Sequence, residues 1–325
     1  MHERSSVPPA RGAAPAPTPR PSTGRPRARA AVVAWAVVVA LTSAAAVAVL
    51  WRFFVVTWAG QRVEDASFDG ARYGQGRLWV VAEPVLDVVS VGFVAAVLLA
   101  AVLIAVVRRR WSLAVQVAVL VGGANLTTQV VKRLLDRPDH GVGADYGNTL
   151  PSGHTTVAAS VSAALLLVVP PRARPAAAVV GAAYTSATGV STLVGQWHRP
   201  SDVVAATFVV LAWVAVVCGA MAVAPAPATT TAALSRVEGG DRWWRRTRAT
   251  VVALVVAAVG SGAFAAVLLT RTWAARADAL TGRAELAAYA GGVAAVVAAS
   301  CLTFALMLVL RHAAGSRDET AAAPA

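Results

Sequence analysis

The sequence predicts an all-α protein whose helices form a bundle that crosses a membrane several times. Of its 325 residues, 57% are hydrophobic and only 14% are charged, and the mean hydropathy is +0.63. A soluble domain usually carries about 25% charged residues. Several apolar runs also exceed the roughly 18 residues that indicate a membrane-spanning helix. These observations exclude an ordinary soluble domain.

The chain before the first apolar run has a different composition. Residues 1–29 are rich in Pro, Arg, Ala and Ser and show no apolar period, which predicts a disordered tail. The apolar run that follows is longer than the hydrophobic region of a signal peptide. We therefore expect it to be retained as the first span.

Eight spans are expected, and they fall into two groups. Residues 30–223 hold a core of six spans, 224–248 form a Pro/Ala/Thr-rich linker, 249–311 hold two further spans, and 312–325 form a polar tail. The expected spans lie at about 31–56, 85–107, 111–131, 151–170, 176–195, 200–223, 249–270 and 287–310.

Arginine placement predicts the orientation in a plasma membrane, because basic residues concentrate in cytoplasmic segments. With the N-terminus in the cytoplasm, an even number of spans places the C-terminus there as well. The inner side then receives the Arg-rich tail, Arg108–Arg110, Arg172, Arg174, the cluster at 242–248 and Arg311. This placement explains the net charge of +13. The sequence has no basic patch with interleaved aromatic residues, so we do not expect nucleic-acid binding.

Three short polar clusters interrupt the apolar pattern, and all fall at span ends on the expected outer face. They are Lys132–His140, Pro151–His154 and Ser191–Asp202. Polar residues within such segments are costly to place and indicate a functional site by default. Lys132 is also the only lysine among 29 basic residues, which indicates a need for a compact ammonium group. We therefore expect the clusters to converge on one pocket.

The residue types in these clusters suit an anion, particularly a phosphate. Lys132 and Arg137 supply positive charge, and a helix that starts at Ser152-Gly153 presents backbone N–H groups. Gly153 allows the backbone to approach the anion closely.

The histidines suit phosphoryl transfer. His198 and Asp202 are four residues apart, which places them side by side on a helix. A carboxylate bonded to one ring nitrogen leaves the other free to attack phosphorus, and His154 can protonate the leaving oxygen. A zinc site is the weaker alternative, because nearby Lys and Arg would repel a bare cation. A purely structural role, as a helix start and a capping pair, is the other alternative.

These motifs resemble those of the type-2 phosphatidic acid phosphatase (PAP2) superfamily of membrane lipid phosphatases. That family carries Lys-x6-Arg-Pro, Pro-Ser-Gly-His and Ser-Arg-x5-His-x3-Asp on a six-span core. In this chain the second motif is complete at 151–154, and the third retains Ser191, His198 and Asp202 at the family spacing. The resemblance covers about residues 31–223.

The resemblance implies a role for each matched residue. His198 would be the nucleophile, Asp202 its orienting partner and His154 the acid for the leaving group. Lys132, Ser152 and the Gly153 amide would hold the phosphoryl oxygens. The resemblance further implies that neither a metal nor another cofactor is required. The substrates that the resemblance implies for this protein are lipid phosphates or diphosphates, such as phosphatidic acid or undecaprenyl diphosphate.

Two positions depart from the family pattern. Asp139-His140 stands where the family has Arg-Pro, although Arg137-Pro138 occurs two residues earlier, and Thr192 stands where the family has Arg. We expect Arg137 and Arg199 to replace the two missing guanidinium groups.

The sequence therefore predicts an integral membrane phosphatase that acts on a lipid phosphate at the outer face. Two alternatives remain: a non-catalytic lipid-phosphate binder or transporter, and a phosphotransferase with an acceptor other than water. The expected partners are the lipid bilayer and the lipid substrate, and the sequence does not define an oligomeric state.

Overall fold

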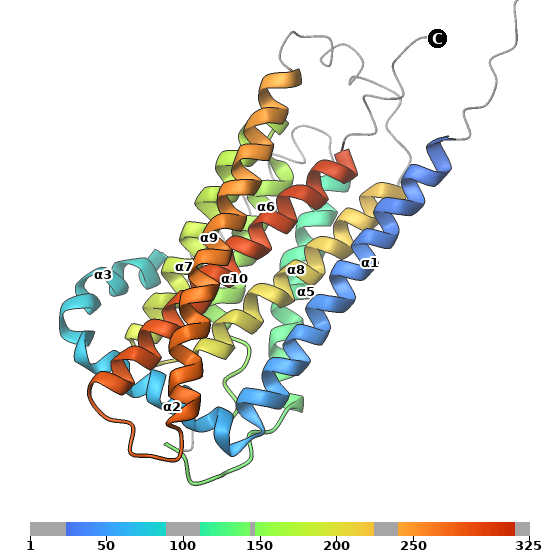
Figure 1. Ribbon diagram of the computed structural model, residues 1–325. Coiled ribbons are helices and arrows are strands. Elements are labelled where there is room, and N and C mark those ends of the chain that lie inside the picture. Colours follow the sequence, from blue (N-terminus) through green and yellow to red (C-terminus); the bar gives the residue numbers. More distant parts are fainter. Residues whose placement is uncertain (1–23, 89–110, 144–146, 224–239, 316–325) are drawn as a thin grey trace, which may run out of the picture.

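The computed structural model describes residues 24–88, 111–143, 147–223 and 240–315, and these residues form helices and loops without a strand (Figure 1). The predicted all-α bundle is thereby confirmed. The elements are α1 (Gly24–Leu50), η1 (Trp51–Val55), α2 (Trp58–Gly70), η2 (Ala71–Tyr73), α3 (Gln75–Val88), α5 (Trp111–Leu134), α6 (Gly153–Val168), η3 (Pro171–Ala173), α7 (Arg174–Val194), α8 (Pro200–Val223), α9 (Gly240–Ala274) and α10 (Arg283–Gly315).

Six helical stretches among the described residues are long and apolar enough to cross a membrane. They cover 29–55, 112–134, 171–194, 200–223, 245–274 and 283–314. The expected fourth span forms α6, which has only 16 residues, because it starts after Pro151 and ends before Pro170-Pro171, where proline disfavours a continuing helix. The expected span at 85–107 lies mostly outside the described residues.

Helix boundaries differ from the expected segments at three places. α1 begins at Gly24, inside the segment expected to be a disordered tail, and α9 begins at Gly240, inside the expected linker. The polar stretch after the first span is also helical, since it forms α2 and η2. Residues 1–23 and 224–239 lie outside the described residues.

Small side chains allow the spans to pack closely around α8. α8 contacts α1, α5, α6 and α10, and buried residues occur on all of its faces. In a membrane, such packing depends on van der Waals contact between small residues. Gly123 fits against the ring of Trp213 and Gly181 against Phe304, where a Cβ would clash.

α2 lies across one end of the bundle, beside the loop between α5 and α6 (Figure 1). The Thr57 hydroxyl caps α2 by accepting a hydrogen bond from Gly60 N at 3.0 Å. The buried face of α2 includes three polar side chains, Gln61, Glu64 and Ser67. Gln61 Nε2 donates to the carbonyls of Val55 at 2.7 Å and Pro138 at 2.8 Å. α2 is thus fixed to the loop that carries the first polar cluster.

Candidate active site

The second and third polar clusters are joined at one end of the bundle. Ser152 N, just before α6, donates a hydrogen bond to the carbonyl oxygen of Asp202 at 2.9 Å. Asp202 lies in the first turn of α8. The expected convergence of these two clusters is therefore present in the structure.

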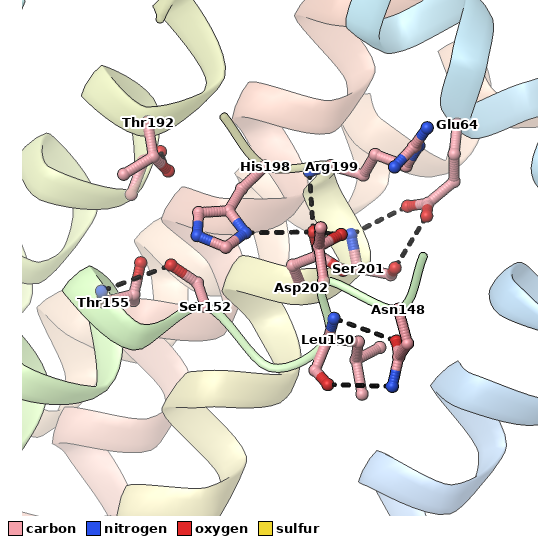
Figure 2. A network of polar contacts seen from close by, with 12 residues as sticks. Glu64, Asn148, Leu150, Ser152, Thr155, Thr192, His198, Arg199, Ser201 and Asp202 are labelled. Atoms are coloured by element: carbon pink, nitrogen blue, oxygen red, sulfur yellow. Dashed lines mark hydrogen bonds and ion pairs between the residues drawn. The ribbon is translucent and has the colours of Figure 1, made fainter. Parts of the chain in front are cut away.

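Asp202 is the centre of the polar network, and only 1% of its surface is exposed. One carboxylate oxygen, Oδ2, accepts from His198 Nδ1 at 3.2 Å, Arg199 N at 3.0 Å and Thr149 Oγ1 at 2.7 Å (Figure 2). Since an ionised carboxylate only accepts hydrogen bonds, Nδ1 is the donor in the bond to His198. In a neutral ring with this tautomer, the other nitrogen, Nε2, carries no proton and can act as a nucleophile.

His154 faces His198 from the first turn of α6. The centroids of the two rings are 6.4 Å apart. The two imidazole rings are therefore neighbours at this end of the bundle. The ring centroid of His154 also lies 5.4 Å from that of Trp197, and the Trp197 centroid lies 5.8 Å from that of Trp79 in α3.

The start of α6 combines a cap with an open approach. The buried Ser152 hydroxyl accepts a hydrogen bond from Thr155 N at 3.3 Å, so it caps the helix (Figure 2). A Cβ at Gly153 would meet no atom within 4 Å. An anion can therefore approach the N–H groups of the first turn, where the helix dipole is positive.

Lys132 and Arg137 lie near this cluster. Lys132, in the last turn of α5, is within electrostatic range of Asp202 and His154. Arg137 is half-buried, and its Nη2 has no hydrogen-bond partner among the described residues. Burial, and then the neighbouring Arg199, lower the pKa of the Arg137 guanidinium. A nearby anion would relieve both effects.

Arg199 points to a different side of the network. Figure 2 shows its side chain extending toward Glu64, whereas the ring of His198 points the opposite way. Its side chain is buried, its guanidinium lies 5.3 Å from the Phe68 ring centroid, and its Nε has no partner within the described ranges. Thr192, where the family has Arg, is also buried and donates to the Gly189 carbonyl at 2.7 Å.

Glu64 is a buried residue of this network that the motifs did not indicate. Its Oε1 accepts from Ser201 N and its Oε2 from Ser201 Oγ, both at 2.8 Å (Figure 2). Burial, and then the charge of Asp202, raise the pKa of Glu64 to about 7. The helical spacing of Gly60, Glu64 and Ser67 on one face of the polar stretch was the available signal for a buried face.

No group of three or more His, Cys, Asp or Glu side chains in the described parts of the chain is arranged to hold a metal ion. The groups that can bind or react with an anion at this end of the bundle are the His198–Asp202 pair, His154, the nearby cations and the N-terminus of α6.

These features define a multi-pass membrane helix bundle with paired histidines at one end. Residues 113–225, from α5 to the end of α8, match the family model described as the PAP2 superfamily. That segment is similar to the PAP2 superfamily, and the resemblance seen in the motifs is confirmed over it. The match and the apolar helices support a membrane protein of the phosphatase type. No curated protein and no solved structure matches the chain.

Proposed function

We propose that this protein hydrolyses a lipid phosphate or diphosphate through a phosphohistidine intermediate on His198. The observation that supports this most strongly is the paired geometry of the two histidines. Asp202 holds Nδ1 of His198 at 3.2 Å, and His154 faces the same ring across 6.4 Å. This arrangement offers a nucleophile on one side of a phosphoryl group and an acid on the other.

The proposed reaction has two steps. His198 Nε2 forms a bond to phosphorus while the bond from phosphorus to the leaving oxygen breaks, and His154 gives its proton to that oxygen. Water then attacks the phosphohistidine, His154 takes a proton from the water, and the N–P bond breaks to release phosphate. Asp202 stabilises the positive charge on the His198 ring in both steps.

The phosphoryl oxygens are held by positive groups around the gap between the histidines. We assign this role to Lys132, Arg137 and the N–H of Gly153. Ser152 contributes by capping α6 and so fixing its first turn. The unpartnered Nη2 of Arg137 supports its assignment. Arg199, which extends toward Glu64, would act on the phosphate only through a change of side-chain direction.

The substrate we propose is an amphiphilic lipid whose phosphate reaches the site at the outer face of the plasma membrane. Arg placement supports this orientation. Because the neighbouring spans are apolar, a lipid tail can remain in the bilayer while its phosphate enters the polar end of the bundle. Phosphatidic acid and a polyprenyl diphosphate both have this form.

A non-catalytic lipid-phosphate binder is the second function that an observation favours. Thr192 places no charge where the family has an arginine, and its hydroxyl is already bonded to Gly189. A site with fewer guanidinium groups can hold a phosphate without stabilising the transition state.

Phosphate release by the purified protein in detergent tests the proposal. Phosphatidic acid and a polyprenyl diphosphate are supplied in the presence of EDTA, and wild type is compared with His198→Ala. We expect release that resists EDTA and falls at least about 10³-fold in the variant. Asp278→Asn, at an exposed residue of the loop between α9 and α10, is the control and should retain release. Binding of both lipids without any release would favour the binder.

A further inference from the structure

The α2 helix contributes a buried carboxylate to the site from outside the segment that matches the family. Glu64 lies in α2, whereas the match begins at residue 113. Only 2% of the Glu64 surface is exposed. Burying a carboxylate costs several kcal/mol unless hydrogen bonds or charges compensate. No salt bridge to Glu64 is formed among the described residues.

The compensation comes from the first turn of α8. Ser201 N and Ser201 Oγ both donate to Glu64 at 2.8 Å. These bonds satisfy one of the backbone N–H groups that a helix start leaves without a partner. Ser201 lies between Arg199 and Asp202, and Arg199 N donates to Asp202 Oδ2 at 3.0 Å. Glu64 and Asp202 therefore hold the same turn from two sides.

We propose that Glu64 is a positioning residue, which fixes the first turn of α8 through Ser201 and so holds Asp202 and the His198 ring ready for attack. This inference rests on the proposed function of the site. Its carboxylate also adds negative charge behind Asp202, which stabilises the cationic ring of phosphorylated His198. The His198 ring is hydrogen-bonded to Asp202, which lies beside the turn that Glu64 holds, so Glu64 acts through Asp202.

The charged groups around Glu64 come from several elements. α8 contributes Asp202, the turn before α8 contributes Arg199, and the loop after α5 contributes Arg137. α10, which also packs against α2, directs Glu285 to Arg72 and Tyr73 instead.

The carboxylate of Glu64 changes its charge near neutral pH, because burial and Asp202 raise its pKa to about 7. Both hydrogen bonds survive protonation, since Oε1 still accepts from Ser201 N and a protonated Oε2 can donate to Ser201 Oγ. A fall in pH through 7 therefore removes charge but keeps the anchor. We expect kcat to rise with pH through this range as Glu64 ionises.

Two variants separate the anchor from the charge. Glu64→Gln keeps groups that can bond to both Ser201 atoms but has no charge at any pH. It should lower the plateau of kcat by about three- to tenfold and remove the rise of kcat with pH near 7, with KM unchanged. Glu64→Ala leaves two buried donors unpaired and should lower kcat by about 10²-fold. Asp69→Asn, on the same helix, is the control.

Hydrogen exchange of residues 199–203 supplies a readout that does not depend on activity. Exchange should be faster in Glu64→Ala and unchanged in Glu64→Gln and Asp69→Asn. Unchanged exchange in Glu64→Ala would overturn the anchoring role. A Glu64→Gln profile that keeps the wild-type rise with pH would overturn the role of charge. Absence of phosphate release by the wild-type protein would refute the proposed function instead. The exchange result would still decide whether Glu64 anchors the first turn of α8.

Discussion

Replacing Asp202 by asparagine separates the charge of this residue from its shape. All three donors to the Asp202 carboxylate converge on Oδ2, and the distance from His198 Nδ1 to Oδ2 is 3.2 Å. An asparagine that places its amide oxygen at this position keeps the three hydrogen bonds. The variant should therefore fold, and the main change is that the His198 ring faces a neutral amide.

The size of the effect follows from the positive charge that His198 gains when it attacks phosphorus. At an effective dielectric constant of about 20, opposite unit charges at this separation attract by about 5 kcal/mol. The amide dipole recovers part of this energy, so we expect a loss of about 3–5 kcal/mol in the transition state. That loss corresponds to a fall in kcat of about 10²–10⁴-fold.

Initial rates of phosphate release over a range of lipid concentrations measure this fall. KM should change little, because Asp202 does not face the phosphate. Asp278→Asn, at an exposed residue in the loop between α9 and α10, is the control and should match wild type. A kcat for Asp202→Asn within about threefold of wild type, in a folded protein, would refute the role of Asp202 charge.

Two further predictions concern the phosphate cations and helix packing. Arg137→Ala should lower kcat/KM by about 10²–10³-fold in the release assay, and unchanged turnover in both Arg137→Ala and Arg199→Ala would show that neither replaces a missing motif arginine. Gly189→Ala would place its Cβ 2.5 Å from Val203 of α8, so it should lower the free energy of unfolding by about 1–3 kcal/mol. Thermal unfolding in detergent measures this, with Gly260→Ala as the control because no atom lies within 4 Å of its added Cβ.

Most of the bundle and the His198–Asp202 pair could be predicted because both depend on local spacing. Apolar length identifies the spans, and a separation of four residues places His198 beside Asp202. Span topology was sufficient to predict that Pro151–His154 would meet the third cluster. These inferences need only helix geometry and the alternation of membrane faces.

The contribution of α2 could not be predicted in the same way. Glu64 is buried because α8 and α10 pack against α2, and those contacts join residues far apart in the sequence. The direction of Arg199 also depends on the non-helical turn before α8, where adjacent side chains point to opposite sides (Figure 2). Sequence spacing does not define such a turn.

The most direct test of the phosphohistidine is to trap it. Wild type is mixed with a lipid substrate that carries a labelled phosphoryl group, and the reaction is stopped with alkali, in which a phosphohistidine is stable and which denatures the protein. We predict label on His198 that acid removes, and no label in His198→Ala. Rapid phosphate release by a wild-type protein that never carries label on His198 would contradict the mechanism.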